Sequence, residues 1–304
     1  MDKMDIGKLI KDRREEQNIT QEELCEGICT ASTLSRIEAG KFNSNTGVLT
    51  RLLERLGLSA DFLREATNDE DYIVRQKIRD INHLNISGDR EKAHSKLDEL
   101  GKNYETFSVE NKQRYDVIET KIMYEDGLID AKTQLDHLED SLLLTIPNYD
   151  EYNLPKYMTN MEAQILRDIA NSYGLMEDYE PAITILVHIK SNIERYAVDK
   201  DFSAKKLISI CYSLSKYLGL VGRYDESIQA ARDGMSYCEY VGDSRMLPSC
   251  MYNCAWSLSR RNYYGDKEEA KKLANEALSL CTSRAWNSEE LTECINRLKK
   301  EIEI

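Results

Sequence analysis

The residues whose types and spacing could do chemistry lie between Thr20 and Gly40. Their apolar spacing predicts two short helices joined by a tight turn, and in the second helix Leu34 and Ile37 should face inward. Hydroxyl and guanidinium groups near the start of a helix can donate hydrogen bonds to base edges in the major groove of DNA. The second helix is therefore a candidate recognition helix, with an outer face formed by Ser32, Thr33, Ser35 and Arg36.

Helices on both sides must position the two predicted helices between Thr20 and Gly40. Thr20 is expected to cap the first helix of the pair, because Glu23 follows three residues later as a capping box requires. A preceding helix is predicted over residues 6–17, a fourth helix ends at Gly57, and a short fifth helix begins at Leu58. Five helices have the size of an independent DNA-binding domain, which we assign to residues 1–66.

The same residues carry a family resemblance. They resemble the Cro-type helix-turn-helix of phage repressors and their bacterial relatives through Arg14, the pair Thr20-Gln21 and the run Ser-Arg-Ile-Glu-Ala-Gly at 35–40. The resemblance implies that Arg14 and Glu38 form a structural salt bridge beneath the recognition helix and that Gln21 contacts a DNA phosphate. It also implies that the base-facing positions are Ala31, Ser32, Thr33 and Arg36.

The net charge of −13 argues against a protein that coats nucleic acid along its whole length, because neutralising phosphates requires a concentrated cationic surface. Residues 1–66 carry 10 Lys plus Arg and 12 Asp plus Glu, so any contact with DNA must be local. Lys41 follows the recognition helix directly and is, with Arg51, a candidate phosphate contact. The basic side chains expected to gather on one face are Lys8, Lys11, Arg13, Lys41, Arg51 and Arg55.

Catalytic and metal sites are not expected. Eight cysteines and four histidines occur without a C-x-x-C pair or a neighbouring histidine, so we expect no metal site and no other cofactor. Most cysteines fall on apolar helix faces and are interpreted as small core residues in a reducing compartment. No phosphate loop, Ser-His-Asp or Cys-His constellation appears, which argues against an enzyme. With no signal peptide and no bilayer-spanning apolar run, the expectation is a cytoplasmic protein without a membrane partner.

After a short polar linker at residues 67–71, residues 72–304 are predicted to form successive helix pairs. In the clearest pair, over 169–186, a small residue, an aromatic residue and an alanine recur at spacings that resemble a tetratricopeptide repeat. A helix from Ser288 onward should cap the array. The expected fold is all-α, a helix-turn-helix domain followed by a right-handed tetratricopeptide-like superhelix. Equivalent small residues mark five pairs at Ala93, Ala131, Ala182, Ser227 and Ala270.

The repeat resemblance also implies which side chains face a ligand, since the first helix of each pair lines the concave wall of such arrays. Asparagine both donates and accepts hydrogen bonds and can hold a peptide backbone, while Lys216 and Arg167 could bind a carboxylate. The aromatic residues would form apolar pockets or, as an alternative, pack between helices. The predicted peptide-binding residues are Arg75, Asn82, Arg167, Asn171, Tyr212, Lys216, Tyr252, Asn253 and Trp256.

A Cro-type domain on five helix pairs with a capping helix resembles the peptide-pheromone receptors of Gram-positive bacteria, the RRNPP family that includes PlcR, PrgX, NprR and the Rgg regulators. The resemblance implies a homodimeric transcription regulator of quorum-sensing type. Its partners would be a double-stranded DNA operator and a short imported signalling peptide, with RNA polymerase as a further candidate. Peptide binding would change the placement of the two DNA-binding domains, and therefore the half-site spacing they engage.

Two other functions remain open. The repeats could form a protein-interaction scaffold that is recruited to DNA without a peptide ligand. They could also inhibit a phosphatase or a response regulator, as relatives without a DNA-binding domain do.

Overall fold

The computed structural model describes residues 6–41, 46–58, 69–150, 153–196, 200–283 and 289–303. These residues form α-helices and their connections, apart from one 3-10 helix at Tyr104–Thr106 and an isolated β-bridge between Asp150 and Asn153. The chain divides into two compact units, the first containing the described residues up to Ser172 together with Tyr196, and the second containing the others. Each unit is described by itself below.

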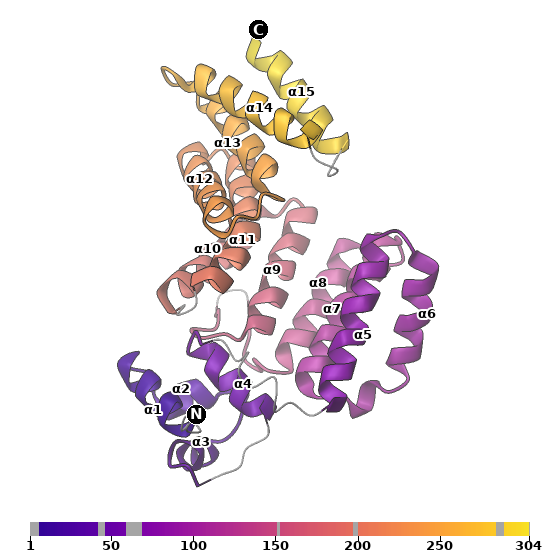
Figure 1. Ribbon diagram of the computed structural model, residues 1–304, viewed down its shortest axis with the longest axis vertical. Helices are drawn as coiled ribbons and strands as arrows, with labels where there is room; N and C mark the ends of the chain where they lie inside the picture. The colour runs from indigo at the N-terminus through magenta and orange to yellow at the C-terminus, as the bar shows by residue number, and fades with distance from the viewer. Residues whose placement is uncertain are drawn as a thin grey trace. The chain divides into compact units, whose positions relative to one another are not determined.

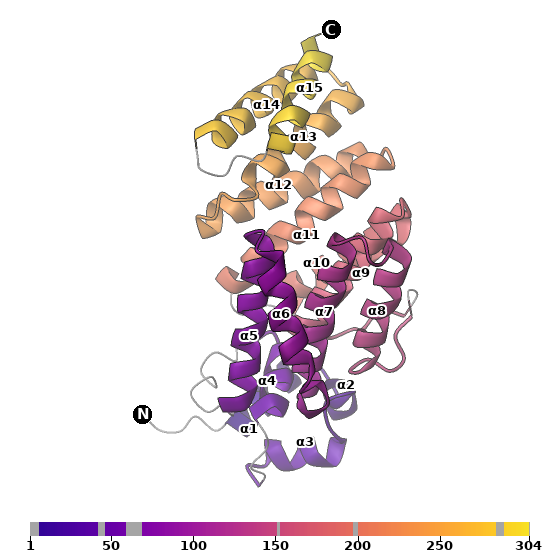
Figure 2. The same ribbon diagram turned by 90° about the vertical axis from the view of Figure 1, so that its right-hand side faces the viewer.

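The first unit begins with four helices, α1 (Ile6–Glu16), α2 (Gln21–Cys25), α3 (Ala31–Glu38) and α4 (Thr46–Arg55). It continues with α5 (Asp69–Ile86), α6 (Arg90–Gly101), α7 (Val109–Glu125), α8 (Ala131–Leu143) and most of α9 (Asn160–Leu175). The second unit contains α10 (Tyr179–Tyr196), α11 (Lys200–Leu220), α12 (Tyr224–Val241), α13 (Leu247–Arg261), α14 (Asp266–Ser283) and α15 (Glu289–Glu303). Figures 1 and 2 show these helices from two directions.

Local sequence explains where several helices begin. The predicted capping box is present at α2, where the Thr20 hydroxyl accepts from the Glu23 amide at 3.1 Å and Glu23 Oε2 accepts from the Thr20 amide at 2.8 Å. Asp130 caps α8 through its side chain alone, accepting from the Thr133 amide at 2.8 Å. Gly222, with φ of +79°, supplies the left-handed residue that lets the chain turn from α11 into α12.

The tetratricopeptide-like repeats predicted from the sequence are confirmed. Helices α5 and α6, α7 and α8, α11 and α12, and α13 and α14 pack against each other as successive pairs. Four of the five small residues expected at the helix crossings are fully buried, namely Ala93, Ala182, Ser227 and Ala270. Ala131 is half-buried because it is the first residue of α8. Small side chains at these positions let the paired helices approach closely.

Helix α15 covers the end of the second unit, as expected of a capping helix. Ile295, Leu298 and Ile302 repeat at helical spacing and are buried in one core with Leu258 of α13 and Ala274 of α14. Without α15, the apolar faces of α13 and α14 would meet water. The cysteines also behave largely as expected, since six of the eight are buried and all eight are free thiols.

The boundary between the predicted domains differs in detail from expectation. Helix α5 begins at Asp69, so residues 69–71 of the predicted linker are helical. The predicted fifth helix falls mostly on residues outside those that the structure describes.

Candidate nucleic-acid interface and ligand pocket

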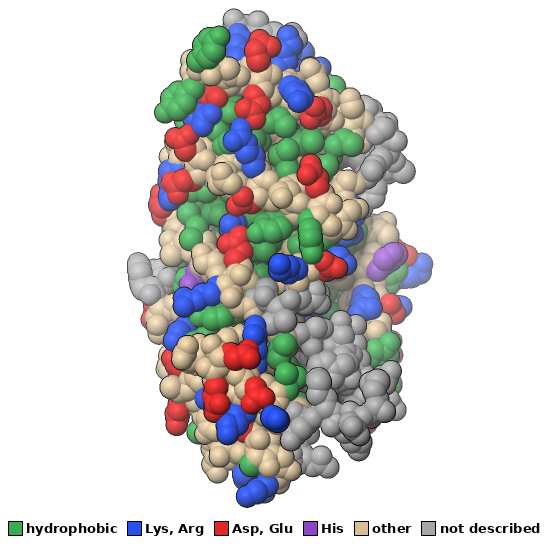
Figure 3. Space-filling model, turned by 60° about the vertical axis from the view of Figure 1, so that its left-hand side comes forward, with side chains coloured by type: hydrophobic (Ala, Val, Ile, Leu, Met, Phe, Trp, Pro, Cys, Tyr) green, Lys and Arg blue, Asp and Glu red, His purple; other side chains and the backbone are tan. Residues whose placement is uncertain are grey.

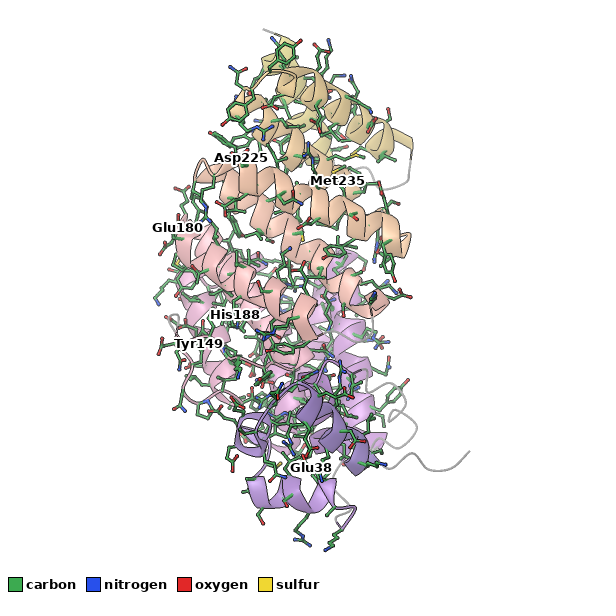
Figure 4. The ribbon with its side chains drawn as sticks, turned by 90° about the vertical axis from the view of Figure 1, so that its left-hand side faces the viewer. Glu38, Tyr149, Glu180, His188, Asp225 and Met235 are labelled. Carbon is green, nitrogen blue, oxygen red and sulfur yellow. The ribbon has the colours of Figure 1, made fainter. Side chains whose placement is uncertain are left out.

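A buried ion pair fixes the candidate recognition helix α3. Arg14 Nε donates to Glu38 Oε1 at 2.7 Å, and Arg14 Nη2 donates to Glu38 Oε2 at 3.0 Å. Arg14 Nη1 also donates to the Ile19 carbonyl at 2.9 Å. Because the Glu38 carboxylate is buried, this bidentate pairing replaces the hydration that it loses. The salt bridge predicted from the sequence is present, and Figure 4 shows Glu38 on the side of α3 that faces the rest of the domain.

Gln21 belongs to the same hydrogen-bond network. Its Nε2 donates to Glu38 Oε2 at 2.7 Å, and the residue is half-buried. The predicted phosphate contact would require Nε2 to exchange this internal partner for DNA. In the structure, Gln21 therefore supports the orientation of α3.

The outer face of α3 has the exposure that base contacts require. Ser32, Ser35 and Arg36 are exposed, Ala31 and Thr33 are half-buried, and Leu34 and Ile37 lie in the core. The Thr30 hydroxyl caps the helix by accepting from the Thr33 amide at 3.2 Å. Lys41, directly after α3, is also exposed. The helix thus presents small polar groups and a guanidinium on a rigid support.

Two residues of the predicted basic face are buried, so the prediction is wrong for Arg51 and Arg55. Arg51 is 8% exposed and donates through Nη2 to the Gly27 carbonyl at 2.7 Å. Arg55 is 5% exposed and donates through Nη1 to the carbonyls of Leu24, at 3.3 Å, and Glu26. Both guanidinium groups brace the connection between α2 and α3 and cannot contact phosphates. On the face shown in Figure 3, acidic and basic side chains of the described residues are interspersed, without a broad basic patch.

Helix α4 also joins the helix-turn-helix region to α9. Arg55 Nη2 donates to Oε1 of the fully buried Glu162 at 3.1 Å, and the Asn160 amide donates to Glu54 Oε2 at 3.0 Å. Glu162 closes a capping box at the start of α9, where its Oε2 accepts from the Thr159 amide at 2.6 Å. One carboxylate therefore both starts α9 and anchors it to α4.

The connection between α8 and α9 completes the core of the helix-turn-helix region. Tyr157 is 6% exposed and shares a hydrophobic cluster with Ile10, Leu24 and Leu53. A Cβ atom added to Gly27 would lie 1.9 Å from the Thr145 carbonyl oxygen, so the two backbones are in close contact there. Within the first unit, the helix-turn-helix region is consequently packed onto the connection between α8 and α9.

A titratable carboxyl group lies in this contact. Glu110 of α7 lies 4.0 Å from Arg51 Nε, and both side chains are largely buried. Burial raises the pKa of Glu110 to about 7, with a further contribution from Glu54, and burial lowers the pKa of Arg51. Desolvation therefore outweighs the attraction between the two charges. The contact between α4 and α7 should become less favourable when Glu110 ionises.

The second unit contains a pocket of about 600 Å³ between α11, α13 and α15. This volume lies within the range of small-molecule and peptide-side-chain sites. All five residues that the sequence assigned to a ligand in this part of the chain line it, namely Tyr212, Lys216, Tyr252, Asn253 and Trp256. The resemblance to a tetratricopeptide repeat thus located residues that converge in space.

The polar groups of the pocket differ in their availability. Asn253 Nδ2 donates to Ser215 Oγ at 2.9 Å and to the Tyr212 carbonyl at 3.2 Å, so it is engaged in holding α13 to α11. In contrast, the Tyr212 and Tyr252 hydroxyls and the Trp256 indole make no hydrogen bond to any described residue. Burial raises the pKa of both tyrosines, which keeps their hydroxyls protonated donors. These three groups are the better candidates for contacting a peptide backbone.

The other four predicted peptide-binding residues belong to the first unit and are not part of this pocket. Arg75 on α5 is half-buried and its Nε has no hydrogen-bond partner among the described residues. Asn82 accepts from Lys121 Nζ at 3.3 Å, and Arg167 Nη2 pairs with Asp168 at 2.9 Å. Asn171 is half-buried on α9. Their contact with a ligand stays a prediction.

Sequence reasoning missed the side of the pocket that α14 and α15 form. Its apolar wall includes Leu280 of α14 and Leu291 of α15, and its rim includes Glu290. Helix α15 was expected only as a cap, and its amphipathic pattern accounts for the buried side but gives no signal that its first turn faces a cavity. Among the residues that the structure describes, no cluster of His, Cys, Asp and Glu could hold a metal ion, and no helix is long and apolar enough to cross a membrane.

The fold and these two regions define a helix-turn-helix protein with tetratricopeptide-like repeats. Residues 10–63 match the helix-turn-helix family profile HTH_3, which places α1 to α4 in a known class of domain. A search of curated protein sequences gave no significant match.

Solved structures share the fold over nearly the whole chain. PlcR of Bacillus thuringiensis in complex with the peptide PapR7 and DNA has a TM-score of 0.58 and 20% identity, covering 94% of this chain and 98% of its own. Its apo form has a TM-score of 0.61 and 16% identity, covering 95% and 98%. ComR from S. thermophilus in complex with DNA and its signalling peptide ComS has a TM-score of 0.51 and 15% identity, covering 98% and 100%. At these identities, the similarity establishes a common fold.

Proposed function

We propose that the protein is a sequence-specific DNA-binding transcription regulator of quorum-sensing type, controlled by a short imported signalling peptide. The observation that carries this proposal is the presence in one chain of an exposed recognition helix, α3, and an aromatic pocket between α11, α13 and α15. We further propose that it acts as a cytoplasmic homodimer on an operator with two half-sites and has no enzymatic role. RNA polymerase is a candidate partner in activation.

The similar structures support the proposal that both DNA and a short peptide are ligands. PlcR was solved with the peptide PapR7 and DNA, and ComR with DNA and the signalling peptide ComS. The shared order of a helix-turn-helix region followed by repeats makes the same pair of ligands the best inference for this chain.

The contacts of α4 suggest how a signal from the repeats would reach DNA. Arg55 and Glu54 tie the helix-turn-helix region to the first turn of α9, and Arg51 faces Glu110 of α7. A movement of α7 or α9 would therefore carry α3 with it. A peptide produces such a movement only if it binds one arrangement of the helices more tightly than the other.

Two substitutions in and beside α3 test the DNA part of the proposal. After selection of an operator from random duplexes, Arg36→Ala should lose about 1–3 kcal/mol of discrimination between the operator and a scrambled duplex, because Arg36 occupies a base-facing position. Lys41→Ala should weaken binding to both duplexes equally and reduce the salt dependence. Unchanged discrimination in Arg36→Ala, with normal helicity, would remove Arg36 from the reading surface.

A protein-interaction scaffold recruited to DNA is the second candidate. It would use the same helix-turn-helix region but ignore short peptides. Titration with a library of short apolar peptides, followed by the intrinsic fluorescence of Trp256, separates the two functions because Trp256 lines the pocket. A scaffold should give no spectral change with any member of the library.

A further inference from the structure

Two opposite charges flank the aromatic pocket without ion-pair partners. Lys216 on α11 and Glu290 on α15 both line the pocket, both are exposed, and neither forms an ion pair with any residue that the structure describes. The Lys216 ammonium lies 5.8 Å from the centre of the Tyr217 ring, a distance at which the ring gives only weak compensation. Both charges are thus available to a ligand.

The third charged residue of the rim is already neutralised. Arg245 Nε lies 2.9 Å from both carboxylate oxygens of Asp243, and this hydrogen bonding lowers the pKa of Asp243. Among the described residues that line it, the pocket therefore offers one available cation and one available anion. A polyphosphate ligand is disfavoured, because it needs several cations and would be repelled by Glu290. A ligand with one positive and one negative end matches the charges.

The packing of the helices limits the length of such a ligand. Helix α13 packs against both α11 and α15. Since packed helices are about 8–10 Å apart, the axes of α11 and α15 are at most roughly 16–20 Å apart. An extended peptide spans about 3.3–3.6 Å per residue, so no more than about five residues fit across this distance.

We infer that the pocket recognises a peptide of up to about five residues by its two free ends, with the terminal carboxylate at Lys216, the terminal ammonium at Glu290 and a large apolar side chain against Tyr252 and Trp256. This inference rests on the proposed peptide-dependent function and specifies its ligand. The unpartnered Tyr212 and Tyr252 hydroxyls would bind the peptide backbone between the two ends. Asn253 contributes by fixing α13 against α11.

The test uses the full-length protein carrying Trp286→Phe, which leaves Trp256 as the single tryptophan of the two in the chain. A library of pentapeptides with Ala, Leu, Ile or Phe at the three middle positions is titrated by Trp256 fluorescence. The tightest member is then prepared with an acetylated amino end, an amidated carboxyl end, or both. Each blocked end should weaken binding about fivefold, the upper range for an exposed ion pair.

Variants assign each end to a residue. Lys216→Met should abolish the effect of amidation but keep that of acetylation, and Glu290→Gln should do the reverse. Lys271→Met and Glu289→Gln are matched controls, since both residues are exposed and neither lines the pocket. Both controls should keep both effects.

Two negative results have different meanings. Tight binding of the free peptide with no loss on blocking either end would overturn the inference while leaving the peptide-dependent function in place. Failure of every pentapeptide, and of longer apolar peptides in the same assay, would contradict the proposed function itself. Equal effects of blocking in the wild type and in Lys216→Met would assign the carboxylate to another residue and also overturn the inference.

Discussion

The helix-turn-helix region uses arginine for two different purposes on two of its helices, α3 and α4. On α3, Arg36 is exposed beside serine hydroxyls, on a surface suited to base edges. On α4, Arg51 and Arg55 are buried against the carbonyls of the connection between α2 and α3, and Arg55 pairs with Glu162 of α9. The basic residues of such a region therefore need not all face DNA, and Arg55 on α4 holds the region to α9 of the same unit.

The largest effect is expected from a substitution that breaks the buried ion pair between Arg55 of α4 and Glu162 of α9. Glu162→Gln leaves the buried Arg55 guanidinium without its carboxylate, which should cost about 3–5 kcal/mol of unfolding free energy. Urea denaturation followed by circular dichroism measures the loss. Asp136→Asn, which removes an exposed pair with Lys132, is the control and should cost at most about 0.5 kcal/mol. Equal losses in the two variants would show that the α4 contact is not a buried charge pair in solution.

The next effect concerns Glu110, which faces Arg51. Its pKa rises on folding from 4.5 to about 7, so the folded state binds the proton more tightly than the unfolded state. The resulting stabilisation is complete below about pH 4.5 and is lost as the pH rises through 7, on the order of 3 kcal/mol in total. Glu110→Gln should lack this part of the pH dependence. Denaturation curves between pH 4.5 and 8 that run parallel for the two proteins would contradict this assignment.

Alanine substitutions at two glycines separate the cost of backbone strain from the cost of a steric clash. Gly27 and Gly40 have φ values of +64° and +66°, so alanine should cost each about 1–2 kcal/mol. Only at Gly27 would the new Cβ meet another backbone, that of Thr145, whereas nothing lies within 4 Å at Gly40. Gly27→Ala should therefore lose about 1–3 kcal/mol more than Gly40→Ala. A smaller loss at Gly27 would mean that the connection between α8 and α9 is not packed there.

The helix-turn-helix motif could be predicted because its signals are local. Thr20 with Glu23 is recognisable from a three-residue spacing, whereas the pairing of Arg14 with Glu38 is what the resemblance to Cro-type domains implies, and both contacts are present. The burial of Arg55 could not be predicted in this way, since its partner Glu162 is 107 residues away. Tyr157 was missed for the same reason, because nothing in a polar connection indicates that one tyrosine enters a distant core.

In the repeats, the residues that could be predicted were those that follow the repeat pattern. The resemblance to tetratricopeptide repeats placed Tyr212, Lys216, Tyr252 and Trp256 on ligand-facing helices, and these residues line the pocket. Periodicity did not show that Asn253 is engaged within the unit, because this depends on Ser215 two helices earlier. Nor did it show that the first turn of α15 closes one side of the pocket.

The most direct test of peptide control is a pair of titrations on one sample. The affinity for the selected operator is measured with and without the tightest library peptide, and the affinity for that peptide with and without operator. We expect both affinities to change by the same factor, about fivefold or more, because coupling between two binding sites is reciprocal. Operator affinity that is identical at zero and saturating peptide would contradict control of DNA binding by the repeats.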